Sequence, residues 1–158
     1  MKQISVIQLL SALNTESQAL EPFIELLKKE QSMLVENLTD QLIELSEQKT
    51  VQALKLNDLA QSRRALLQNS ISSLSVDSIN AWLKINCPEG LIVWQKILML
   101  AKNSQRLNQT NGELIQMKLR HNQQSLAVLS SAFNQANLYG PDGQPSFAPG
   151  NSRSLGSV

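Results

Sequence analysis

Hydrophobic residues recur along this chain at intervals of three, four and seven, the spacing of an amphipathic α-helix. In the stretch from Ile4 to about Glu36, one leucine column repeats every seven residues, with more apolar side chains between its members: Leu13, Leu20, Leu27 and Leu34, with Leu10, Ile24 and Leu38. A seam of this kind is typical of a coiled coil and predicts a long first helix. Pro22 interrupts the seam and predicts a kink there or a helix start near Leu20.

The remaining segments predict three more helices. Thr39 suits the N-cap of a second helix that runs to about Gln68, and Asp40 suits its first turn. Because the link between the first two helices is short, we expect an antiparallel hairpin over Ile4–Gln68. Ser75 is predicted to cap a short helix, Val76–Ile85. Pro88 suits the start of a long helix, Glu89–Asn137.

No alternating run is long enough for a strand, so the predicted fold class is all-α: an elongated bundle of long antiparallel helical hairpins with coiled-coil character. In the long helix, the spacing predicts two apolar edges with a smaller, more polar strip between them. One edge contains Trp94, Ala101 and Asn108, the other contains Val93, Leu100 and Leu107, and the strip contains Ile97, Ser104 and Asn111. One edge is expected to pack on the hairpin, which leaves the other for the short helix, a second subunit or a client protein.

The composition changes after Leu138, where four of the six glycines and three of the five prolines lie. We therefore expect a helical domain over residues 1–137 and a disordered Gly/Pro/Ser-rich tail over residues 138–158. The tail begins with the sequence Leu138-Tyr139-Gly140-Pro141-Asp142-Gly143-Gln144, in which Gly-Pro-Asp-Gly is a strong turn signal.

The charge argues against nucleic acid as a partner, because the net charge is only +1 and no basic, aromatic-bearing face is evident. Residues 1–78 contain ten acids and seven bases, and residues 79–158 contain seven bases and three acids. This asymmetry favours antiparallel helix pairing. A single cysteine, the lack of a visible signal peptide and the lack of a long apolar run predict a cytoplasmic protein without membrane insertion.

Little in the sequence suggests catalysis, a cofactor or a metal site. Cys87 and His121 are the only residues of their kinds, and neither has a visible partner of catalytic type. We expect both to be dispensable and the protein not to be an enzyme. The acids of the first half are interpreted as solvated helix surface (Glu16, Glu21, Glu25, Glu30, Glu36, Glu44 and Glu47). The pair Arg63-Arg64 is also interpreted as helix surface.

Two features of the last third stand out. Asn108, Asn111, Gly112 and Asn122 lie in or beside the seam of the long helix. Seam asparagines fix register at a cost in stability, and a glycine permits another backbone to approach closely. These residues either set the pairing of the bundle or keep this face open for a foreign helix. Similarly, Tyr139 either packs back on the bundle or serves as a recognition residue.

At these residues the sequence closely resembles the FlgN family of flagellar export chaperones. The resemblance is carried by Leu107-Asn108-Gln109-Thr110-Asn111-Gly112-Glu113-Leu114-Ile115, by Arg120–Leu129 and by Leu138–Gln144. It implies long helical hairpins, no catalysis, and a bacterial cytoplasmic chaperone of type III export. The implied clients are the hook–filament junction proteins FlgK and FlgL, which the family delivers to the export gate protein FlhA.

The resemblance places client binding in the C-terminal region and associates the tyrosine matching Tyr139 with docking at the gate. The apolar residues of the long helix expected to bind the client are Leu114, Leu119, Leu126, Leu129 and Phe133. A client helix laid in an apolar groove is the physical mode expected for such a contact. The alternative is a coiled-coil scaffold that uses the same seam only for self-association, as in a homodimer.

Overall fold

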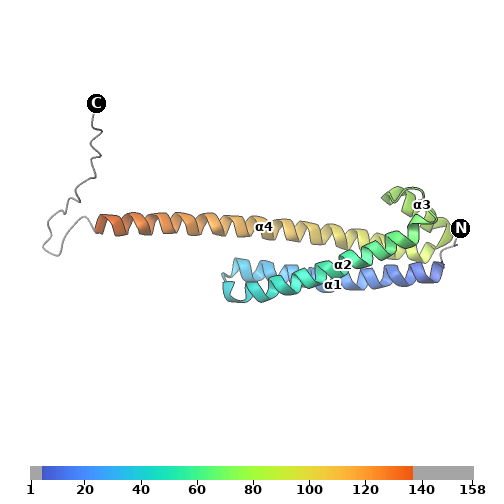
Figure 1. The fold of residues 1–158 in the computed structure, drawn as a ribbon, viewed down its shortest axis with the longest axis horizontal. Coiled ribbons are helices and arrows are strands. Elements are labelled where there is room, and N and C mark those ends of the chain that lie inside the picture. Colours follow the sequence, from blue (N-terminus) through green and yellow to red (C-terminus); the bar gives the residue numbers. More distant parts are fainter. Residues whose placement is uncertain (1–4, 137–158) are drawn as a thin grey trace, which may run out of the picture. The chain divides into compact units, whose positions relative to one another are not determined.

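The computed structural model describes residues 5–136, in which the regular elements are all helical (Figure 1). These elements are α1 (Val6–Val35), a 3₁₀ turn (Thr39–Gln41), α2 (Leu42–Gln68), α3 (Val76–Asn86) and α4 (Pro88–Ala136). The predicted all-α class is therefore confirmed. The chain divides into two units, Met1–Ile115 and Gln116–Val158. The predicted tail, residues 138–158, lies outside the described residues.

The hairpin of α1 and α2 forms as predicted, but its details differ. Pro22 lies inside α1, which begins at Val6, so of the two predicted alternatives the helix start near Leu20 is wrong. The helix ends where Asn37 adopts a left-handed φ of 59°, a conformation that asparagine tolerates better than most residues. The Leu38 amide then donates to the Met33 carbonyl at 2.9 Å, which completes a helix-ending motif.

Thr39 does not cap α2, contrary to the prediction. Residues Thr39–Gln41 form a 3₁₀ turn, and α2 begins at Leu42 with no capping hydrogen bond from the Gln41 side chain. The turn itself provides the first backbone bond, from the Leu42 amide to the Thr39 carbonyl. A tight turn has thus taken the place of a side-chain cap.

Two other predicted helix starts are confirmed. Ser75 caps α3, because its hydroxyl accepts a hydrogen bond from the Ser78 amide at 3.2 Å. Cys87 separates α3 from α4, and Pro88 is the first residue of α4. A proline suits this position because the first amide of a helix has no acceptor within the helix.

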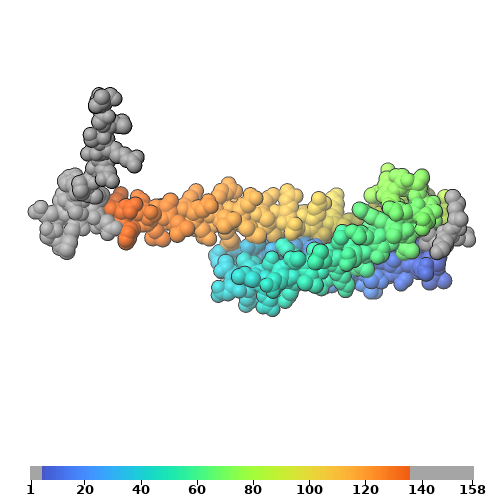
Figure 2. Space-filling model, viewed as in Figure 1, coloured from blue at the N-terminus to red at the C-terminus, as the bar shows by residue number. Residues whose placement is uncertain are grey.

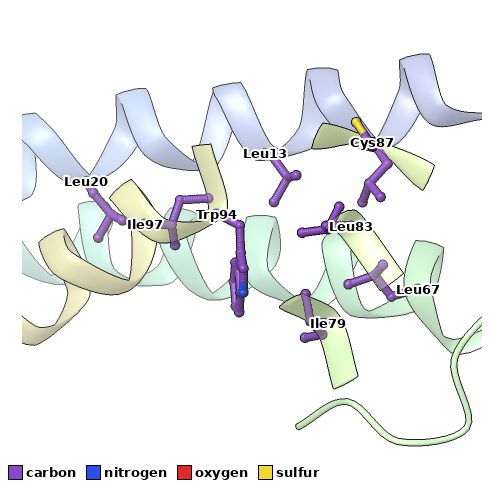
Figure 3. Packing of buried hydrophobic residues seen from close by; sticks show 9 residues of the cluster. Leu13, Leu20, Leu67, Ile79, Leu83, Cys87, Trp94 and Ile97 are labelled. Carbon is purple, nitrogen blue, oxygen red and sulfur yellow. The ribbon is translucent and has the colours of Figure 1, made fainter. Parts of the chain in front are cut away.

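The core joins all four helices of the first unit at the α3 end of the hairpin (Figure 3). It contains leucines of α1 and α2, two residues of α3, and the first turns of α4. Its buried members are Leu9, Leu13, Leu20, Leu67, Ile79, Leu83, Cys87, Trp94 and Ile97. The helix α1 buries eleven of its 30 residues, whereas α2 buries three of its 27. The other helices therefore gather around α1.

The face of α4 that packs inward in the first unit differs from the prediction. Its buried residues include Ile97, Ser104 and Asn111, which belong to the strip predicted to lie between two apolar edges. By contrast, Ala101 and Asn108 are exposed, and Val93, Leu100 and Leu107 are only half-buried. The prediction that an apolar edge packs on the hairpin thus holds at Trp94, which is buried in the core, but is wrong further along α4, where Ala101 and Asn108 of the same edge are exposed. At Asn111 the reason is that α1 presents polar groups there, the Leu27 carbonyl and the Glu30 carboxylate, which accept hydrogen bonds from the Asn111 amide.

We expect Leu83→Ala to lower the free energy of unfolding by about 2–5 kcal/mol, because it opens a cavity in the core. Leu83, on α3, is 0% exposed and belongs to the core cluster. Ile85→Ala is the matched control on the same helix, since Ile85 is 81% exposed, and it should change stability by less than about 0.5 kcal/mol. Urea unfolding followed by circular dichroism measures both. Equal effects of the two variants would contradict this core.

Candidate partner-binding surfaces

A buried ion pair connects the two arms of the hairpin. Arg63 of α2 donates from Nε to Glu16 Oε2 at 2.7 Å and from Nη2 to Glu16 Oε1 at 3.2 Å. Its guanidinium carbon also lies 4.6 Å from the ring centroid of Trp94 on α4. A cation over an indole ring is an attractive arrangement, and it brings α4 into the same contact as α1 and α2. Arg63 thus joins α1, α2 and α4.

A second polar cluster lies further along α1, where Glu30 contacts both neighbouring helices. Lys49 Nζ of α2 lies 3.0 Å from Glu30 Oε1, and Asn111 Nδ2 of α4 lies 2.9 Å from Glu30 Oε2. The same Asn111 nitrogen donates to the Leu27 carbonyl at 2.8 Å. One carboxylate therefore receives hydrogen bonds from two helices, which fixes the alignment of all three.

These clusters correct three surface predictions. Glu16, Glu30 and Arg63 are buried and paired rather than solvated. Arg64 is exposed, as expected. A charged residue on a single helix carries no sign of its partner, so periodicity alone cannot separate a buried acid from a surface acid. The only signal of burial in the sequence was position on the helix: Glu16 and Glu30 each lie three residues after a seam leucine, Leu13 and Leu27, and so on the same side of the helix.

The four predicted seam residues of α4 do not act as one group. Asn111 is buried and bonded to α1, whereas Asn108 and Asn122 are exposed. Gly112 has no described atom within 4 Å of the place where a Cβ would lie. Gly90 is the crowded glycine instead, but its near neighbours are side chains: a Cβ there would lie 2.8 Å from Cys87 Sγ. Among the predicted residues, Asn111 is thus the one that sets the alignment of the first unit.

The predicted client-binding residues are mostly exposed. Leu114 is half-buried in the first unit. In the second unit, the side chains of Leu119, Leu126, Leu129 and Phe133 are between 55% and 66% exposed. Their spacings are seven, three and four residues, so they share one face of the helix. Large apolar side chains are exposed on the other side of this helix as well, at Met117 and Val128. Tyr139 lies outside the described residues.

The residues considered for chemistry have different surroundings. Cys87 is a buried free thiol, and His121 is exposed. Within residues 5–136, no group of three or more His, Cys, Asp or Glu side chains could hold a metal ion. In the same part of the chain, the helices lack a stretch long and apolar enough to span a membrane.

The described residues define an all-α helical-bundle protein. The chain matches the model of a family described as FlgN protein over residues 1–146. It therefore belongs to the FlgN family.

Two curated relatives share part of this sequence. Each is called flagella synthesis protein FlgN, one from Yersinia enterocolitica and the other from Yersinia enterocolitica serotype O:8 / biotype 1B. Each is 50% identical over 50 residues, which is 32% of this chain and 33% of the relative. The similarity thus spans about a third of the length of these relatives. No solved structure matches.

Arg63→Met is expected to destabilise the first unit by about 3–5 kcal/mol, because the buried Glu16 carboxylate would lose its partner. Arg64→Met, at the exposed neighbouring position, should change stability by less than about 0.5 kcal/mol. The double variant Glu16→Gln/Arg63→Met should recover much of the loss, since it no longer leaves a buried charge unpaired. Thermal and urea unfolding measure these changes. A double variant as unstable as the two single losses added together would contradict a coupled pair.

Proposed function

We propose that this protein is a cytoplasmic chaperone of flagellar type III export that binds the hook–filament junction proteins FlgK and FlgL before their secretion. It delivers them to the export gate protein FlhA for assembly of the flagellum. Membership of the FlgN family supports this proposal. The observation that carries it is the exposed face formed by Leu119, Leu126, Leu129 and Phe133.

The proposed client contact is an amphipathic helix laid along this face, with anchors spaced three, four and seven residues apart. Burying a leucine or phenylalanine side chain contributes about 1.5–3 kcal/mol, so the four side chains together offer about 6–12 kcal/mol. A client segment that is disordered before binding loses about 2–5 kcal/mol on ordering. Because association itself also costs about 4–15 kcal/mol, these four side chains alone do not account for tight binding, and the proposed contact needs further residues of the same helix.

The main alternative is a scaffold that uses the same face only to bind a second copy of itself. A long helix with a three-and-four apolar spacing is compatible with either use. The two functions predict different behaviour of the purified protein. Self-association would bury the face before any client is added, whereas a chaperone would bind client segments one to one through it.

Leu126→Asp and Leu129→Asp should each weaken binding of the C-terminal segments of FlgK and FlgL by several kcal/mol, because a charge would enter an apolar contact. Gln124→Asp is the matched control, since Gln124 is exposed on the same helix, about half a turn around from the Leu126 column. Titration calorimetry with each client segment measures the affinity, and circular dichroism confirms that the variants stay helical.

Light scattering on the same samples separates the two functions. Unchanged client affinity in both leucine variants, with loss of a dimer, would support the scaffold and contradict the chaperone. A lower client affinity in a protein that stays monomeric throughout supports the chaperone.

Tyr139→Ala should leave client affinity and helical content close to unchanged while weakening binding to the cytoplasmic domain of FlhA. The proposed reason is that a tyrosine offers a large contact area with few rotatable bonds, as interface anchors do. Tyr139→Phe serves as the control that keeps the ring. Surface plasmon resonance with FlhA and a secretion assay for FlgK measure the outcome. A lowered melting temperature with intact docking would show that Tyr139 packs on the protein instead.

A further inference from the structure

The helix α2 is far less covered than its partner α1. It buries Leu45, Arg63 and Leu67 out of 27 residues, whereas α1 buries eleven of 30. Three large apolar side chains of α2 stand mostly in solvent: Ile43, Val51 and Leu54, which are 75%, 64% and 62% exposed. Figure 2 shows the atoms of α2 at the surface on the face in view. Of these three side chains, Val51 lines a groove between α1 and α2.

One side of this helix forms a groove of about 760 Å³ with α1. Its apolar lining comes from Pro22 and Leu26 of α1 and from Val51 of α2. Pro22 has no amide hydrogen, so the Gln18 carbonyl lacks the hydrogen bond that a helix would normally give it. The α2 side of the groove, Glu44 to Gln52, spans about 12 Å at 1.5 Å per residue. It therefore suits about two turns of a guest helix.

The charged residues of the groove are mostly acidic. Glu25, Glu44 and Glu47 line it, together with a single base, Lys29. Glu25 pairs with Lys28 at 2.9 Å, outside the lining. Over residues 5–136, neither Glu44 nor Glu47 forms an ion pair. Glu44 accepts one long hydrogen bond, from Gln48 Nε2 at 3.5 Å, so both carboxylates keep oxygen atoms for a cationic guest beside the apolar floor.

We propose that this groove between α1 and α2 docks a basic amphipathic helix of a partner protein. The apolar side of the guest would cover Leu26 and Val51, and its lysines or arginines would face Glu44 and Glu47. The charge of the groove argues against an acidic guest, because like charges repel across an interface. This surface shares no residue with the proposed client face, so the chain would carry two separate protein-binding sites.

Two designed 18-residue peptides with the same leucine positions provide the probe, one with lysine and the other with glutamate at its polar positions. A scrambled lysine peptide of equal composition controls for charge without an apolar face. Fluorescence anisotropy should show the lysine amphipathic peptide binding at least tenfold more tightly than the other two, with an affinity that falls as salt rises. Equal binding of the scrambled lysine peptide would overturn the proposal, because charge alone would then suffice.

Charge reversal locates the binding. Glu44→Lys/Glu47→Lys should weaken the lysine peptide roughly tenfold, since two attractive contacts become repulsive. Glu36→Lys/Glu113→Lys changes the same net charge at exposed positions outside the groove and should leave binding within about twofold. A similar loss in both variants would overturn the proposal. A photo-crosslinker at Gln52, in the groove, should capture the peptide, whereas one at the exposed Gln61 should not.

The proposed client site serves as an independent control. The groove variant Glu44→Lys/Glu47→Lys should bind the FlgK segment as the unchanged protein does, and Leu126→Asp should bind the lysine peptide normally. If Leu126→Asp abolished peptide binding, the peptide would be using the client face, and the groove proposal would fail while the proposed function stood.

Discussion

The arrangement of the first unit depends on carboxylates buried along α1. Glu16 receives Arg63 from α2, and Glu30 receives Lys49 from α2 and Asn111 from α4. A carboxylate removed from water is costly unless its oxygens are hydrogen-bonded, so each of these acids tolerates few alignments of its neighbours. Leucine columns repeat every turn or two and would accept several registers. The paired charges select one of them.

This constraint explains why α4 uses a polar strip where an apolar edge was expected. A helix that faces Glu30 and the Leu27 carbonyl needs a donor there, which Asn111 provides. Seven residues earlier, the hydroxyl of Ser104 donates a hydrogen bond to the Ala101 carbonyl of the same helix. Ser104 therefore needs no hydrogen-bond partner on the hairpin. Nearer the core the same strip becomes apolar at Ile97, beside Trp94. The face of α4 thus changes from apolar to polar as its surroundings on α1 change.

How far the sequence predicts this structure depends on whether a signal is local. Helix positions followed from spacing, and the Ser75 cap and the Pro88 start followed from residues that satisfy backbone groups close to them. The Thr39 cap failed because a 3₁₀ turn can satisfy the same amides, and sequence does not separate the two. The buried acids were missed because burial is a property of pairs: nothing near Glu16 in the sequence indicates Arg63, which is 47 residues away. For the client site, the prediction of an apolar helix face came from spacing, while the role of that face came from resemblance to a family.

The buried pairs also bear on where this protein can bind others. Specific alignment in the first unit is set by a few polar contacts on α1, so the outer side of α2 contributes little to holding the bundle together. Surface that stability does not require is free to vary in chemistry, and here it combines exposed valine and leucine with Glu44 and Glu47, which form no ion pair within residues 5–136. The helix residues 116–135 present a different surface, with exposed leucines and phenylalanine and no acidic residue. Because the two surfaces differ in charge, they would select guests of different chemistry. If both proposed sites are used, neither contact involves the residues that align the helices, because Glu16, Glu30, Arg63 and Asn111 line neither surface.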